Sequence, residues 1–170
     1  MSDPAWTRLR RQDRAMPDEA AIEALLQRGA FGFTATALDG QPFLHVGTYW
    51  YDGAARRIYF HTAREGRTRE NVLRNPRVCF GVAEIGRLLP ATTAMNFGNE
   101  YAGVMIFGRA RLVEDAQEMR HGLQGLLDKY FPEQRPGRDY RPITDAELAQ
   151  TSVFAIEIEA WSGKQEIAPP

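Results

Sequence analysis

The chain has 170 residues, of which 44% are hydrophobic and 25% charged, a balance typical of a folded soluble protein and unlike that of a disordered one. Its formal net charge of −1 gives no overall attraction to nucleic acid or to anionic lipid, so neither is expected as a partner. No apolar run approaches the roughly 18 residues needed to span a bilayer. Because the N-terminus also lacks a signal-peptide core, we expect a cytoplasmic protein.

Residues 1–16 are expected to form an N-terminal arm. Four arginines lie in it, at positions 8, 10, 11 and 14, and we interpret it as a solvated arm that docks on its own domain or on a partner. A helix is predicted to begin at residues 16–19, because Pro17 suits a first turn and Asp18 and Glu19 complement the helix dipole. Its apolar positions and its expected C-terminal cap are Ile22, Leu25, Leu26 and Gly29.

From Phe31 the pattern changes to that of β-strands. Asp39-Gly40 and Asp52-Gly53 are strong turn signals between segments rich in β-formers. Further along the chain, a loop containing Pro90 separates two more such segments. Six strands are predicted, over residues 31–38, 42–51, 57–62, 77–82, 101–113 and 152–161.

Two helices are predicted before the last strand. Asp115 with Glu118, and Thr144 with Glu147, have the three-residue spacing of a capping box. Tight turns join most of the predicted strands, so the sheet should be antiparallel and should close on itself. With no linker to divide it, the chain is expected to form one α+β domain over residues 1–170, a six-stranded antiparallel β-barrel with flanking helices.

Neither the cysteine nor the histidines indicate a metal site. Cys79 lies in an apolar strand segment and is interpreted as a small buried hydrophobe, with a reactive thiol as the alternative. His45, His61 and His121 lack the spacing of zinc ligands. His121 is expected to be a partly exposed residue on a helix, and His61, at a strand end, is the better candidate for contact with a cofactor.

The segment between the third and fourth strands has the composition of a phosphate-binding loop. A strand ends at His61 or Thr62, and a helix is predicted to begin near Gly66 or Arg67. A helix N-terminus offers unpaired N–H groups and partial positive charge, and arginine adds donors that match phosphate oxygens. The alternative is a surface turn in which the arginines of this segment form ion pairs with Glu65 and Glu70.

The order of motifs resembles one family. The features are the Asp-Gly hairpin, "IYFHTAREGR", "NPRVCFGV", "LLPA", a fifth strand that contains tyrosine and a closing "WSGK". This order is similar to that of the FMN-binding split barrels of the pyridoxamine 5′-phosphate oxidase-like superfamily, and in particular to nitroimidazole-resistance (nitroreductase-like) proteins. The resemblance extends from Arg10 to Lys164.

The resemblance implies an FMN site that a homodimer completes. The flavin would lie across residues 45–48, where Gly47 permits close approach of a flat ring and Thr48 can hydrogen-bond its pyrimidine edge. The phosphate would lie at the loop before the second helix, and the second subunit would close the pocket. The implied cofactor-binding residues are His45, Val46, Gly47, Thr48, His61, Thr62, Arg67, Thr68, Trp161 and Lys164.

One position departs from the family pattern. Relatives usually have lysine where this chain has Thr68, so a cation is missing from the implied phosphate site. Arg69 or Arg64 could supply the charge instead, and a different ligand in the pocket is the alternative.

The expected function is that of a flavoprotein oxidoreductase that reduces a small aromatic or nitro-type acceptor. A flavin itself performs the redox chemistry, so no side chain is assigned as a catalytic acid or base. The alternative is a non-catalytic flavin- or haem-binding carrier or sensor, because the fold alone does not decide between turnover and binding.

Overall fold

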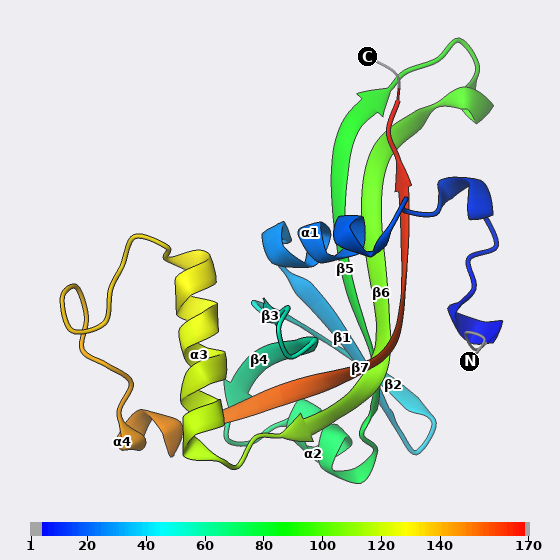
Figure 1. Ribbon diagram of the computed structural model, residues 1–170. Helices are drawn as coiled ribbons and strands as arrows, with labels where there is room; N and C mark the ends of the chain where they lie inside the picture. Colours follow the sequence, from blue (N-terminus) through cyan, green and yellow to red (C-terminus); the bar gives the residue numbers. More distant parts are fainter. Residues whose placement is uncertain (1–4, 169–170) are drawn as a thin grey trace.

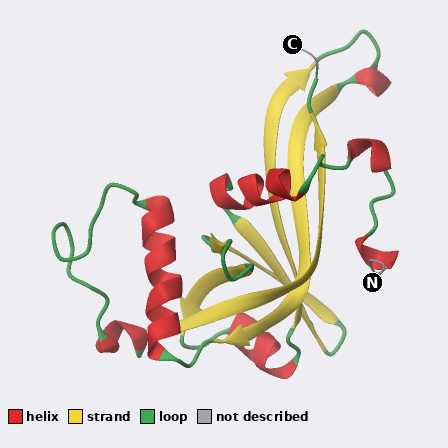
Figure 2. Cartoon of the chain, in the orientation of Figure 1, coloured by secondary structure: helices red, strands yellow, loops and turns green. Residues whose placement is uncertain are grey.

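The computed structural model describes residues 5–168, so the first four residues of the predicted arm and residues 169–170 lie outside the described part. A strongly curved sheet is flanked by helices at its sides and ends (Figures 1 and 2). The helices are α1 (Glu19–Arg28), α2 (Arg67–Arg74), α3 (Ala116–Tyr130) and α4 (Asp145–Leu148), with short 3-10 turns at Ala5–Thr7, Gln12–Arg14 and Ala94–Asn96. The strands are β1 (Gly32–Leu38), β2 (Gln41–Gly47), β3 (Trp50–Asp52), β4 (Arg57–Ala63), β5 (Arg77–Leu89), β6 (Gly98–Leu112) and β7 (Thr151–Glu166).

The strands form one sheet in the order β2-β1-β5-β6-β7-β4-β3, and every pairing between them is antiparallel. This confirms the predicted antiparallel sheet with flanking helices. The described sheet has seven strands, however, so the predicted number of six is wrong.

The difference arises in the predicted strand 42–51, which breaks at residues 48–49. β2 pairs with β1, whereas β3 pairs with β4 at the other end of the strand order. Two contacts hold Tyr49 at the break: its hydroxyl donates to the Leu26 carbonyl at 2.8 Å, and its backbone N–H donates to the Tyr130 hydroxyl at 3.2 Å. These two hydrogen bonds therefore hold Tyr49 at the point where the chain leaves one edge of the sheet and continues to the other.

Three strands continue beyond their predicted ends. β5 reaches Leu89, β6 begins at Gly98 and β7 reaches Glu166, so these strands extend as a long arm past the rest of the sheet (Figure 1). Residues 83–88 contain Ala, Glu, Gly and Arg, which have little intrinsic preference for strands. Pairing between β5 and β6, with an irregularity between Ile85 and Leu88, supplies the hydrogen bonds that keep this segment extended.

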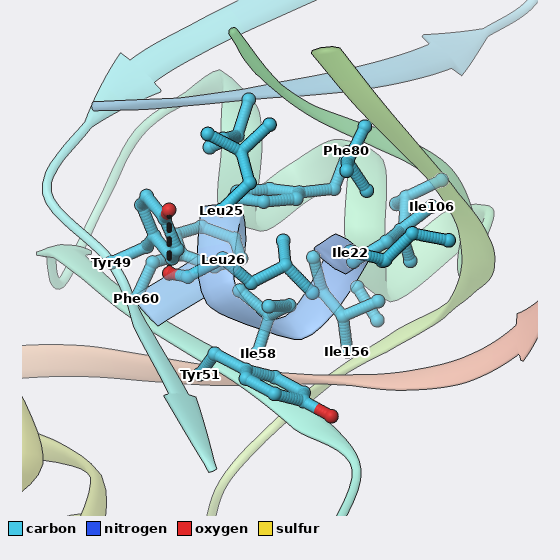
Figure 3. Close-up of a cluster of buried hydrophobic side chains, with 14 of the residues drawn as sticks. Ile22, Leu25, Leu26, Tyr49, Tyr51, Ile58, Phe60, Phe80, Ile106 and Ile156 are labelled. Atoms are coloured by element: carbon cyan, nitrogen blue, oxygen red, sulfur yellow. Dashed lines mark hydrogen bonds between the residues drawn. The ribbon is translucent and has the colours of Figure 1, made fainter. Parts of the chain in front are cut away.

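The main core lies between α1 and the concave sheet (Figure 3). Leu25 and Leu26 of α1 are fully buried, and Phe60 stacks on Phe154 with ring centroids 4.8 Å apart. Figure 3 also shows the hydrogen bond from Tyr49 to Leu26 at one side of this cluster. A second core forms where α3 covers the other face of β4, and there a Cβ on Gly125 would come within 2.1 Å of the Trp50 ring. The small residues of α3 are thus required for its close approach to the sheet.

The helices begin where predicted, but the capping box predicted for Asp115 and Glu118 forms only in part, because the Glu118 carboxylate pairs with Arg111 instead. Asp18 and Asp115 accept hydrogen bonds from the backbone at the starts of α1 and α3, and Thr144 forms a complete capping box with Glu147. Gly29 ends α1 as predicted, but its φ of −59° does not require glycine. A Cβ there would lie 2.6 Å from the Tyr49 hydroxyl, so close packing excludes a side chain.

The described part of the N-terminal arm lies along β7. Ala15 forms a β-bridge with Lys164, the Met16 N–H donates to the Gly163 carbonyl at 2.9 Å, and Arg14 forms an ion pair with Glu166. Within residues 5–168, no helix is long and apolar enough to cross a membrane.

Candidate functional site

The edge strand β2 and the end of β4 meet at a place that we call the β2–β4 junction, formed by Phe43, His45, Gly47, Phe60, His61 and Arg67. β2 pairs only with β1, and β3 pairs with β4 only through residues 57–59. Two contacts bring the sides together: the His45 and Phe60 ring centroids lie 5.5 Å apart, and the Arg67 guanidinium lies 5.4 Å from the Phe43 ring centroid. Within the described sheet, the facing edge of β2 therefore has backbone groups without a strand partner.

Two histidines at this junction favour their neutral forms. Burial lowers the pKa of His45, and the nearby His61 lowers it further by repelling a second positive charge. His61 is exposed, yet the protein atoms around its ring are sufficient to lower its pKa through desolvation. A neutral imidazole has one donor and one acceptor nitrogen, so each ring can donate a hydrogen bond to a polar heterocycle or accept one from it.

Residues 46–48 occupy three different environments. A Cβ on Gly47 would lie 3.0 Å from His45 Nε2, so the glycine leaves room for the His45 ring. Val46 is 52% exposed, like Leu44, on the opposite face of β2 from His45. Thr48 is half-buried and faces a pocket beneath α3. The structure therefore brings His45 and Gly47 to the junction, whereas Val46 points away from it.

The helix α2 begins at Arg67, as predicted, directly after the end of β4. Its N-cap Gly66 has φ of +138°, a conformation that side chains rarely adopt, and no side chain caps the first turn. Thr62 is half-buried and its hydroxyl donates to the Ala63 carbonyl at 2.9 Å, while Thr68 is only 6% exposed. The uncapped amides and the dipole of α2 make this end of the helix electropositive.

The arginines of this segment do not pair with its acidic residues. Over residues 5–168, ion pairs join eleven arginines to carboxylates, but Arg64, Arg67 and Arg69 are not among them. The alternative interpretation, a surface turn in which they pair with Glu65 and Glu70, is therefore wrong. Three cations without a counter-ion at the positive end of a helix form a site suited to an anion.

The last two predicted cofactor-binding residues, Trp161 and Lys164, lie on the long part of β7 and on opposite faces of it. Trp161 packs under the Arg56 guanidinium, which lies 4.2 Å from its ring centroid, on the side of α1. Lys164 lies on the other face, where it lines an apolar groove of about 480 Å³ together with Leu9, Phe33, Leu44, Cys79 and Met105. Within residues 5–168, no hydrogen bond, ion pair or ring contact joins either side chain to the β2–β4 junction of its own chain.

Cys79 and His121, the other two candidate side chains, lie in different parts of the structure. Cys79 lies in β5 as predicted but is half-buried and faces the groove, and burial raises the pKa of its thiol. His121 is 54% exposed, and its Nε2 lies 2.7 Å from the carboxylate of Asp52. Burial raises the pKa of Asp52, but hydrogen bonds from His121 and from backbone amides outweigh burial and lower it overall. Among the described side chains, no group of three or more His, Cys, Asp or Glu is placed to hold a metal ion.

Sequence analysis did not identify the cluster that holds the break between β2 and β3. The Tyr130 hydroxyl donates to the Ala30 carbonyl at 2.7 Å and accepts from the Tyr49 N–H, and Lys129 Nζ lies 3.5 Å from the Tyr49 ring centroid. Burial lowers the pKa of Lys129 to about 8. Tyr49 and Tyr130 are 81 residues apart in sequence, so no local pattern could have indicated this contact.

The strand order and the flanking helices define a split β-barrel protein. A family model described as "Pyridoxamine 5′-phosphate oxidase" matches residues 18–165, and the chain belongs to that family. The predicted membership of this flavin-binding split-barrel family is therefore confirmed. A search of curated proteins found no match.

Three solved structures illustrate the similarity. The flavocytochrome Anf3 from Azotobacter vinelandii has a TM-score of 0.86 and 26% identity, over 98% of this chain and 76% of that one. A putative 5-nitroimidazole antibiotic resistance protein from Bacteroides thetaiotaomicron has a TM-score of 0.75 and 21% identity, over 89% of this chain and 86% of that one. The FAD and haem binding protein from Mycobacterium smegmatis has a TM-score of 0.82 and 19% identity, over 92% and 75%. The last two similarities concern the fold.

Proposed function

We propose that this protein is an FMN-binding oxidoreductase that acts as a homodimer and passes electrons to a small aromatic or nitro-type acceptor. The flavin ring would lie at the β2–β4 junction, and its phosphate at the N-terminus of α2. When bound, a flavin supplies reversible one- and two-electron chemistry, so the protein has to bind, orient and shield it.

The observation that carries the proposal is the set of three arginines without carboxylate partners at the uncapped start of α2. Arg64 and Arg67 are exposed and Arg69 is half-buried, and all three lie within three residues of the N-cap Gly66, after which no side chain caps the first turn. Gly66 has no side chain, and nothing lies within 4 Å of where its Cβ would be. A phosphate monoester fits this donor set because its charge and its oxygens match both the amides and the guanidinium groups.

The residues of the junction suit the other end of the flavin. His45 and His61 favour their neutral forms, so they can orient a heterocycle by hydrogen bonds without placing a fixed positive charge beside it. Phe43 contributes apolar ring surface, and Phe60, which is buried in the core, packs against the His45 ring and supports it. Gly47 keeps the backbone of β2 accessible at the point where the strand ends.

An apolar face supports the proposed dimer. Phe33, Leu44, Val46 and Met105 are 41 to 52% exposed, although they are large and hydrophobic. Three of them line or border the groove that contains Lys164. A second copy of the chain packed on this face would remove it from water and would bring the partner's β7 toward the junction. In that arrangement Lys164 would face the flavin of the other subunit, whereas Trp161 lies on the opposite face of β7 and would support the strand from behind.

The acceptor class rests on similarity and on the absence of any assigned acid or base. The similar protein from Bacteroides thetaiotaomicron is described as a putative 5-nitroimidazole antibiotic resistance protein, which favours a nitro-type acceptor. A second candidate function is a haem- and flavin-binding carrier, because the 26% identical Anf3 is described as a flavocytochrome. Oxidised FMN and haem have different visible spectra, so the absorption spectrum of the purified protein distinguishes these two functions.

The decisive experiment is anaerobic. The FMN-loaded protein is reduced with dithionite and mixed by stopped flow with a panel of nitroaromatics and quinones. Reoxidation of the bound flavin faster than that of free FMN for at least one acceptor supports the proposed oxidoreductase. Reoxidation no faster than free FMN across the panel contradicts it and favours the carrier.

A further inference from the structure

The arginines at the start of α2 differ in how closely the protein surrounds them. Arg64 and Arg67 are exposed, but Arg69 is half-buried. Its Nε nitrogen is shielded from solvent and has no hydrogen-bond partner among the described residues. Buried polar groups almost always have a partner, so this N–H indicates a missing acceptor.

No carboxylate balances the charge of Arg69 either. Glu65 and Glu70 are its acidic neighbours in sequence, and neither forms an ion pair with it, whereas Arg74 at the other end of α2 pairs with Asp39 at 3.4 Å. A cation in the first turn is repelled by the positive end of the helix dipole and by the nearby Arg67. An anion at this end of α2 would relieve both repulsions and would offer an acceptor to the guanidinium group.

The helix geometry places Arg69 apart from Arg67. Successive residues of an α-helix are turned by about 100°, so residues 67 and 69 lie on either side of Thr68. Thr68 is buried and points into the protein, together with Asn71 and Val72. Arg67 lies on the side of β2, where it contacts Phe43, and Arg69 therefore lies on the opposite flank of the helix. An anion on the helix axis at the N-terminus would therefore lie between the two flanks that carry Arg67 and Arg69.

We propose that Arg69 is a second phosphate-binding residue, which supplies the positive charge that the neighbouring Thr68 lacks. This inference rests on the proposed function, because it assumes that the phosphate of FMN lies at the N-terminus of α2. A phosphate monoester has a charge between −1 and −2 near neutral pH, which one guanidinium does not balance. Arg69 thus makes the site selective for the phosphorylated flavin over riboflavin.

The test compares three variants of the full-length apoprotein: Arg69→Gln, Arg67→Gln and the control Arg74→Gln at the far end of the same helix. FMN and riboflavin are titrated separately and followed by the change in flavin fluorescence, and inorganic phosphate is used as a competitor against FMN. Arg69→Gln should weaken FMN binding by about tenfold or more, the loss expected for one charge-assisted hydrogen bond. The Kd for riboflavin should change by less than about twofold. The Arg74 variant should bind both flavins as the unaltered chain does.

A measurement without ligand separates binding from folding. Because Arg69 lacks a partner and is repelled by its surroundings, the apoprotein with Arg69→Gln should have an unchanged or higher Tm. A lower Tm, or equal weakening of FMN and riboflavin, would show that Arg69 has a structural role and would overturn the inference. Unchanged FMN binding in Arg69→Gln together with weakened binding in Arg67→Gln would also overturn it, while leaving the proposed phosphate position intact. If neither variant affects the binding of FMN, the proposed phosphate position itself is wrong.

Discussion

Replacing Arg67 by glutamate changes the first residue of α2 from a cation to an anion. The side chain is exposed, and its contact with the Phe43 ring at 5.4 Å is a cation–π interaction worth about 0.5–1 kcal/mol at such a site. A glutamate there gains about 0.3–1 kcal/mol from the helix dipole. The two effects nearly cancel, so the free energy of unfolding of the apoprotein should change by less than about 1 kcal/mol.

FMN binding should respond much more strongly. Loss of a charge-assisted hydrogen bond to the phosphate costs about 1.5–3 kcal/mol. Repulsion between the new carboxylate and the phosphate adds about 1 kcal/mol at 4 Å in water. The sum, about 2.5–4 kcal/mol, corresponds to a Kd for FMN that is roughly 70- to 900-fold higher. Riboflavin has no phosphate, so its Kd should change by no more than about threefold.

The assay is titration of apoprotein with each flavin at physiological ionic strength. The control, Arg74→Glu, reverses a charge on the same helix about 10 Å along its axis. That separation exceeds the Debye length of about 8 Å, so FMN binding should change little. Equal loss of FMN and riboflavin in Arg67→Glu would mean that the fold or the ring site is damaged, and unchanged FMN binding would refute the phosphate position.

Three further changes test other parts of the structure. Leu44→Asp places a charge on the exposed apolar face, so light scattering should show a monomer instead of the proposed dimer of the unaltered protein. A dimer that survives this change would mean that subunits pair elsewhere. Tyr130→Phe removes hydrogen bonds to Ala30 and Tyr49, and urea unfolding should show a loss of about 1–3 kcal/mol; an unchanged midpoint would show that the tyrosine does not stabilise the break between β2 and β3. Burial lowers the pKa of Lys129 from 10.5 to about 8, so between these values the unfolded chain binds a proton that the folded chain lacks. From pH 8 to 9.5 the unaltered protein should therefore gain stability relative to Lys129→Met, and a constant difference between the two would contradict the lowered pKa.

The sequence alone determined the features that local interactions decide. Asp18, Asp115 and Thr144 begin helices as predicted, because a side-chain acceptor satisfies amides only two or three residues away. The Asp39-Gly40 turn is confirmed, since both residues adopt positive φ between the paired strands β1 and β2. The start of α2 at Arg67 was also predicted, and with it the position of the candidate phosphate site.

Contacts between distant residues decided the rest. The break at Tyr49 depends on Leu26 and Tyr130, and the extension of β5 to Leu89 depends on pairing with β6; neither has a signal within its own segment. The net charge of the candidate site also depends on the tertiary structure, because the sequence does not show whether Arg69 forms an ion pair with a carboxylate. Helix caps and turns involve neighbours along the chain, whereas strand pairing, burial and ion pairs depend on which distant segments folding brings together. The sequence thus located the candidate phosphate loop, and only the three-dimensional packing left its arginines without carboxylate partners.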